Sequence, residues 1–178
     1  MAVTALLERT HSFGQSKWSW FLLALSSTGL TCAALYFQHV LDLQPCIKCI
    51  YQRTAVLGIL LAALIPLIVN TFATRLLALL IWGYSAFEGL MASRAHLEII
   101  FAENPFFMVC DIVPNFPSFM PLHEWLPSIF AATGDCDENS WQFLGMGMAS
   151  WLQVIFIAHL VVLIWVFISL FFKPKQSA

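Results

Sequence analysis

The sequence predicts an all-α membrane protein: a bundle of four transmembrane helices with a long external loop between the third and the fourth. Two observations predict this fold class. Of the 178 residues, 60% are hydrophobic and only 10% are charged, whereas soluble domains carry about 25% charged residues. Four apolar runs are also long enough to approach or exceed the roughly 20 residues that cross a bilayer. The net charge of −2 comes without a basic stripe, so we expect no nucleic-acid partner.

We expect a single membrane domain comprising residues 1–178, with spans at about residues 18–37, 47–70, 76–93 and 151–172.

The first apolar run favours an uncleaved span over a signal peptide. Residues 18–41 contain no charged side chain, and this length exceeds the about 7–15 residues of a signal peptide's apolar core. Cys32 lies within the run, and we expect it to be a small buried hydrophobe without chemistry. Glu88 lies within the third span. An ionisable group at that depth is a functional candidate, but a structural role is an equal alternative.

A polar loop is expected at residues 94–150. It contains five of the eight prolines, seven of the ten acidic residues, and the cysteines Cys110 and Cys136. Loops of this length are usually functional or disordered. Within it, residues 122–130 mix aromatic and aliphatic side chains, which favours either a segment along the membrane interface or a packed loop.

Lysine and arginine residues predict the orientation. Four spans put both termini and the turn expected at residues 71–75 on one side of the membrane. That side would carry five basic residues: Arg9, Lys17, Arg75, Lys173 and Lys175. The other side would carry Lys48, Arg53 and Arg94. Because positive charge gathers in the cytoplasm, we expect cytoplasmic termini and an external loop.

The segment Pro45-Cys46-Ile47-Lys48-Cys49 predicts a redox-active dithiol at the start of the second span. Proline suits the first turn of a helix, and a helix beginning near Pro45 would place Cys46, Cys49 and Arg53 on one face. The positive end of the helix dipole and the guanidinium both favour thiolates, the reactive form of cysteine.

Three roles remain for the four cysteines expected outside the membrane. A Cys₄ zinc site is disfavoured because Cys110 and Cys136 are far apart in sequence and an oxidising compartment works against thiolate ligands; we expect no metal. A pair of structural disulfides is a second alternative, since closing such a loop stabilises by about 3–4 kcal/mol. The third is a relay that passes electrons from a soluble thiol partner through both pairs to a lipid-soluble quinone.

Several segments resemble the disulfide bond formation protein B (DsbB) family: Phe37-Gln38-His39-Val40, Pro45-Cys46-x-x-Cys49-Ile50-Tyr51-x-Arg53, Tyr84-Ser85-Ala86-Phe87, Gly134-Asp135-Cys136 and Trp141-x-Phe143-Leu144-Gly145. The resemblance runs from about Trp18 to Lys173. Members of that family are four-span inner-membrane proteins that reoxidise a periplasmic thioredoxin-fold dithiol oxidase, DsbA, and reduce ubiquinone or menaquinone. This relay is known to keep the bacterial periplasm oxidising.

The resemblance also implies roles for individual residues. Cys110 would be attacked by the partner's thiolate, and Cys136 would be its resolving cysteine. Cys46 would exchange with the loop pair, while Cys49 would form a thiolate–quinone contact. The quinone head group would be held by Arg53, with His96 beside it.

Two other functions are compatible with parts of this pattern. One is a quinol-linked reductase of the vitamin K epoxide reductase type, although that family generally places its loop cysteines ahead of the C-x-x-C. The other is a non-catalytic membrane scaffold held by disulfides.

Overall fold

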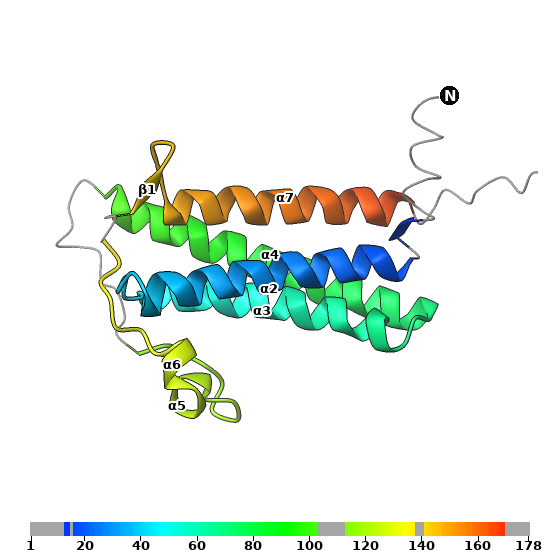
Figure 1. Ribbon diagram of the computed structural model, residues 1–178, viewed down its shortest axis with the longest axis horizontal. Helices are drawn as coiled ribbons and strands as arrows, with labels where there is room; N and C mark the ends of the chain where they lie inside the picture. The colour runs from blue at the N-terminus through cyan, green and yellow to red at the C-terminus, as the bar shows by residue number, and fades with distance from the viewer. Residues whose placement is uncertain (1–12, 15, 103–112, 138–140, 170–178) are drawn as a thin grey trace, which may run out of the picture.

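Four long helices, which run alternately up and down, form the body of the protein (Figure 1). The computed structural model describes residues 13–14, 16–102, 113–137 and 141–169. The long helices in this part of the chain are α2 (Lys17–His39), α3 (Ile47–Ile68), α4 (Phe72–Ile100) and α7 (Met148–Ser169). Each is long and apolar enough to cross a membrane. The predicted four-helix membrane bundle is therefore confirmed.

The smaller elements lie at the end of the bundle where α3 begins (Figure 1). They are the short helices α5 (Leu122–Trp125) and α6 (Pro127–Phe130) and the strands β1 (Gln142–Phe143) and β2 (Met146–Gly147). The two strands form a tight antiparallel hairpin. Its turn needs positive φ at Leu144 (52°) and at Gly145 (77°), a conformation that glycine adopts without strain.

The turn between α3 and α4 is shorter than expected. The prediction placed it at residues 71–75, but α3 ends at Ile68 and α4 begins at Phe72. Thr71 is the N-cap of α4, and it forms a capping box with Thr74. These hydroxyl groups satisfy backbone N–H groups that a helix end leaves free, so the polar stretch begins a helix instead of extending the turn.

The loop boundaries at 94 and 150 were also wrong, because α4 continues to Ile100 and α7 begins at Met148. The prediction ended the third span just before Arg94. Arg94 and Glu98 are both exposed, and residues four apart lie on one face of a helix. A helix can therefore extend out of the bilayer while its charged face stays solvated.

Small residues allow the helices to pack closely. α3 packs against α2 and α4, and α4 also packs against α7. A side-chain carbon added at Gly89 would lie 2.2 Å from the ring of Phe156, which is fully buried. One added at Gly58 would lie 2.3 Å from the Ser85 hydroxyl oxygen. Close backbone approach at small residues is the usual basis of helix association in membranes.

Two residues of the predicted spans face outward. Cys32 is a free thiol on the exposed face of α2, so the expectation that it is buried in the protein was wrong. The face of a membrane helix that meets lipid is as apolar as a core, and hydrophobicity alone does not distinguish the two. Glu88 is likewise exposed, on α4. It therefore does not face the bundle interior.

Candidate active site

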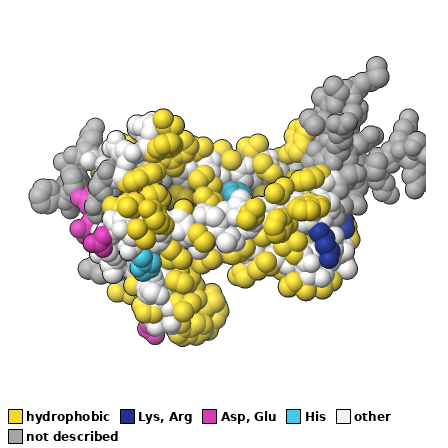
Figure 2. All heavy atoms as spheres, viewed as in Figure 1, with side chains coloured by type: hydrophobic (Ala, Val, Ile, Leu, Met, Phe, Trp, Pro, Cys, Tyr) yellow, Lys and Arg dark blue, Asp and Glu magenta, His cyan; other side chains and the backbone are white. Residues whose placement is uncertain are grey.

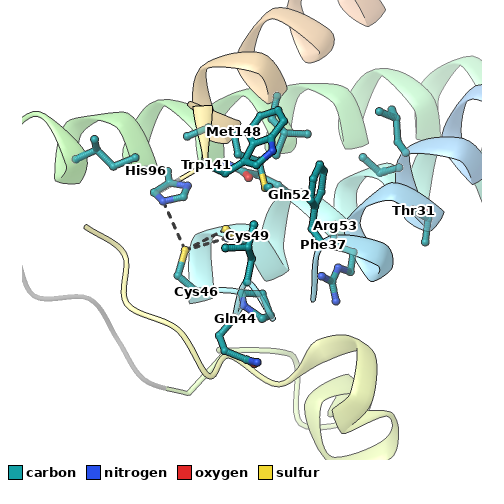
Figure 3. Close-up of a pocket in the computed structure, with 18 of the residues that line it drawn as sticks. Thr31, Phe37, Gln44, Cys46, Cys49, Gln52, Arg53, His96, Trp141 and Met148 are labelled. Atoms are coloured by element: carbon teal, nitrogen blue, oxygen red, sulfur yellow. Dashed lines mark hydrogen bonds between the residues drawn. The ribbon is translucent and has the colours of Figure 1, made fainter. Parts of the chain in front are cut away.

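A cavity of about 110 Å³ lies at the end of the bundle where α3 begins, between α2, α3, α4 and the start of α7 (Figure 3). Its lining includes the side chains of Cys46, Cys49, Gln52, Arg53 and His96. Apolar side chains of Phe37, Trp141 and Met148 line other parts of it. The structure thus brings the predicted C-x-x-C, Arg53 and His96 to one place.

Cys46 is the N-cap of α3, not a residue of its first turn. Its backbone is extended, and its Sγ atom accepts the backbone N–H of Cys49 at 3.4 Å. α3 begins at Ile47, as expected for the second span, but Pro45 lies before the helix and not in its first turn. The sulfur takes the place of the oxygen that usually caps a helix, at the positive end of the helix dipole.

The two thiols of the C-x-x-C are free and close together. Their Sγ atoms lie 3.2 Å apart, and Cys46 Sγ lies 3.6 Å from Nε2 of His96 (Figure 3). The side-chain hydrogen bond with Cys49 is the main cause that lowers the pKa of Cys46 to about 4; burial opposes it and His96 adds to it. A thiolate at Cys46 is therefore favoured at neutral pH, and thiolates perform disulfide exchange.

Cys136 packs directly against the start of α3. It is 3% exposed, and it forms one buried cluster with Cys46 and Ile47. Cys136 is held in a disulfide. Cys110, predicted to be its mate, lies outside the described residues. Exchange between Cys136 and Cys46 would thus need little movement of the chain.

Backbone hydrogen bonds hold the segment before Cys136 in place. The N–H groups of Thr133 and Gly134 both donate to the carbonyl of Pro45, at 3.0 and 3.1 Å. The Thr133 hydroxyl also donates to the side-chain oxygen of Gln44 at 2.7 Å. At Gly134 an added side-chain carbon would lie 2.2 Å from the backbone oxygen of Gln44. Only a residue without a side chain allows this approach.

Arg53 is buried, and it joins three parts of the chain. Its Nη1 donates to the side-chain oxygen of Gln38 on α2 at 2.7 Å and to the backbone carbonyl of Ile129 in α6. Gln38 in turn donates to the carbonyl of Ser128 at 3.3 Å. The charge is thus hydrogen-bonded near the bilayer edge, and among the described residues no carboxylate pairs with it. Its partners come from distant parts of the chain and were not predicted.

Gln52 was not recognised from the sequence. It is 1% exposed, and neither its amide nitrogen nor its amide oxygen has a hydrogen-bond partner among the described residues. A buried amide without partners is costly, and such groups are found where a ligand or water can satisfy them. The signal was available: Gln52 is polar in an apolar span and lies one turn from Cys49, on the same face.

Comparisons with known proteins agree with this geometry. The family model described as "Disulfide bond formation protein DsbB" matches residues 16–166. The chain belongs to the DsbB family. It is thus a membrane protein of disulfide bond formation and a disulfide oxidoreductase, as the resemblance predicted.

Proteins named "Disulfide bond formation protein B" are similar over most of their length. The one from Pseudoalteromonas atlantica is 49% identical over 83% of this chain and 86% of its own. Those from Yersinia pestis (strain Pestoides F) and Escherichia coli O1:K1 / APEC are 44% and 42% identical, each over 96% of this chain and 97% of their own.

The first prediction concerns Gly134→Ala. Because the added methyl group meets the backbone of Gln44, we expect the segment to shift and Cys136 to lose its packing against Cys46. Disulfide exchange between the loop and the C-x-x-C should slow at least tenfold, as measured by rapid quenching and thiol trapping. Gly29→Ala is the matched control, since nothing lies within 4 Å of that position. Equal exchange rates in Gly134→Ala and Gly29→Ala would contradict the assigned contact.

Proposed function

We propose that the protein reoxidises a soluble periplasmic dithiol oxidase of the thioredoxin fold, DsbA-like, and transfers the electrons to ubiquinone or menaquinone in the inner membrane. One observation carries the proposal. The Cys46–Cys49 pair lies between Cys136 on one side and a cavity lined by polar, partly unsatisfied groups on the other. A dithiol in that position suits an electron relay, whereas a pair of structural disulfides would not need a cavity beside it.

The thiol steps conserve electrons and protons. A thiolate of the partner attacks the Cys110–Cys136 disulfide at Cys110, and the second partner thiol completes the partner's disulfide, which leaves Cys110 and Cys136 reduced. Cys136 then attacks Cys46 of the oxidised C-x-x-C, and Cys49 leaves as a thiolate. Attack by Cys110 on the Cys46–Cys136 bond restores the loop disulfide and leaves Cys46 and Cys49 reduced.

The residues of the cavity fit a quinone head group. A quinone supplies the oxidant: it takes up two electrons and two protons as the Cys46–Cys49 disulfide forms again. Gln52 has a free amide N–H₂ and a free amide oxygen, which suit a carbonyl acceptor and a hydroxyl donor. Arg53 Nε and His96 Nδ1 are also buried without partners among the described residues. We propose that Gln52 and Arg53 orient the head group beside Cys49, with His96 next to Cys46.

The distribution of charge supports the orientation proposed for the membrane. Lys17 is the first residue of α2 and Arg75 lies in the first turn of α4, and Figure 2 shows basic side chains at the end of the bundle away from the acidic ones. Arg9, Lys173 and Lys175 lie outside the described residues. Counted over the sequence, that side carries five basic residues against three (Lys48, Arg53 and Arg94) on the cysteine side, so the positive-inside rule favours it as the cytoplasmic side. The C-x-x-C and Cys136 then face the periplasm, where their soluble partner is.

The second prediction tests the function through Cys110→Ala. Purified unaltered protein should reduce a soluble quinone analogue when supplied with a reduced thioredoxin-fold dithiol protein. Cys110→Ala should abolish oxidation of that partner, while the Cys46–Cys49 pair still equilibrates with quinone. Near-normal turnover of Cys110→Ala would favour a structural disulfide. Net reduction of the partner by quinol would indicate the reductase type instead, and inactivity of the unaltered protein would indicate a scaffold.

The third prediction concerns Gln52→Leu, which removes the amide at nearly constant volume. We expect a higher KM for quinone or a rate of quinone reduction at least tenfold lower, because a binding site loses its hydrogen bonds. A single turnover without quinone, in which the preformed disulfides oxidise the partner, should keep its rate. Gln142→Leu is the matched control, since Gln142 is exposed in β1 and does not line the cavity. Equal losses of Gln52→Leu in both assays would make Gln52 a residue of the fold or of the thiol steps.

A further inference from the structure

Three soft ligand atoms converge on one point at the start of α3. These atoms are Sγ of Cys46, Sγ of Cys49 and Nε2 of His96, and all lie within 4.8 Å of one another. The first two come from the N-terminus of α3 and the third from α4. In Figure 3 the dashed lines join Cys46 to both of the other side chains.

The spacing is close to that of a tetrahedral zinc site. Zinc binds sulfur at about 2.3 Å and imidazole nitrogen at about 2.0–2.1 Å. Tetrahedral angles then require an S···N separation of about 3.6 Å and an S···S separation of about 3.8 Å. The observed Cys46–His96 distance is 3.6 Å and the Cys46–Cys49 distance is 3.2 Å. The Cys46–His96 distance needs no change, the sulfurs need to separate by about half an ångström, and Cys49 Sγ lies within 4.8 Å of Nε2 of His96.

The charges also suit a divalent cation. Zinc binds cysteine in the thiolate form, so binding displaces any proton that the two thiols carry. Two thiolates with a neutral imidazole balance a charge of +2. Arg53 is the nearby positive charge that opposes binding, but its Nη1 is directed to Gln38 and Ile129. In Figure 3 its guanidinium lies on the side of α3 away from His96.

We propose that the reduced enzyme, but not the oxidised one, binds zinc(II) through Cys46, Cys49 and His96, with a fourth position open to water. Zinc bound there would inhibit the enzyme at its active site and would not serve as a cofactor. Binding releases the protons that the two thiols still hold and transfers no electron. Oxidation to the Cys46–Cys49 disulfide removes two of the three ligands, so the site exists only between the thiol step and reoxidation. A bound cation would hold both sulfurs and stop the cycle there.

The proposal differs from the zinc site considered from the sequence. That site needed four cysteines, two of them in the loop, and it was disfavoured on spacing and compartment. Here the third ligand is His96, which is 50 residues away from Cys46 in sequence. The oxidising compartment is also a weaker argument against this site, because catalysis itself regenerates the reduced Cys46–Cys49 dithiol in every turnover. The inference does not rest on quinone being the acceptor.

Cobalt(II) is the probe for the fourth prediction, because it occupies zinc sites and absorbs visibly when bound to thiolates. The protein would carry Cys32→Ser, Cys110→Ser and Cys136→Ser, so that Cys46 and Cys49 are the only cysteines left. After anaerobic reduction and removal of quinone, we expect one equivalent of cobalt to give a sulfur-to-metal charge-transfer band and tetrahedral ligand-field bands. Zinc should displace it. Oxidised protein should show neither band.

Two histidine variants make the assignment specific. His96→Gln should weaken cobalt binding at least tenfold, since even loss of a group that only orients a ligand costs about 10–100-fold. His123→Gln should have no effect, because His123 lies in α5 beside Glu124. Unchanged affinity in His96→Gln, or equal binding by the oxidised protein, would overturn the proposal.

A second measurement uses the native sequence and requires no variant to fold. Zinc added to reduced protein should protect Cys46 and Cys49 from alkylation by a membrane-permeant maleimide, as read by peptide mass spectrometry. Cys32, an exposed thiol on α2, is the internal reference and should react as before. Equal alkylation of Cys46 and Cys49 with and without zinc would contradict binding. Neither assay contains quinone or a partner protein, so a failure here is distinct from a failure of the proposed relay.

Discussion

Two hydrogen bonds to the carbonyl of Pro45 hold the parts of this site together. A proline just before a helix cannot itself donate, but its carbonyl remains free to accept. The N–H groups of Thr133 and Gly134 both bind that carbonyl, and the chain then reaches Cys136 two residues later. These backbone contacts fix the segment that carries Cys136, whose side chain is buried in one cluster with Cys46. Any side chain at Gly134 would break this arrangement.

Arg53 provides a second connection between the loop and the bundle. A buried guanidinium is costly unless its hydrogen bonds are satisfied, and here the partners are Gln38 of α2 and the carbonyl of Ile129 in α6. The same side chain lines the cavity behind Cys49. The position of α6 and the polarity of the cavity are therefore coupled through one residue. This arrangement gives Arg53 a structural role in addition to the role proposed for it towards the acceptor.

The sequence predicted the parts of the structure that depend on local patterns. Four spans follow from hydropathy, and the dithiol at the start of α3 follows from the C-x-x-C spacing. Thr71 could have been recognised from the sequence as the N-cap of α4, but residues 71–75 were predicted to be a turn. The exposed face of α2 at Cys32 could not be predicted, because lipid-facing and core-facing surfaces have the same composition.

Contacts between distant residues were the other part that the sequence did not predict. His96 was expected at the site from the resemblance alone, but not its contact with the sulfur of Cys46. Ile129, which binds Arg53, and the residues that bind Pro45 lie about 75–90 residues away from them along the chain. Gln52 was overlooked because a single polar residue in a span has many explanations. Gln52 is recognised as a candidate binding residue only in the structure, where its unsatisfied amide lines the cavity.

The central claim is that Cys136 and Cys46 are placed for direct exchange, and one disulfide tests it most directly. In a protein carrying Cys49→Ala and Cys110→Ala, the remaining cysteines are Cys32, Cys46 and Cys136. Mild oxidation of the folded protein, followed by peptide mass spectrometry, should yield a Cys46–Cys136 disulfide in nearly every molecule. It should yield no disulfide to Cys32, which lies on the exposed face of α2. If Cys46 and Cys136 both remained alkylatable thiols under these conditions, the relay through this contact would be wrong.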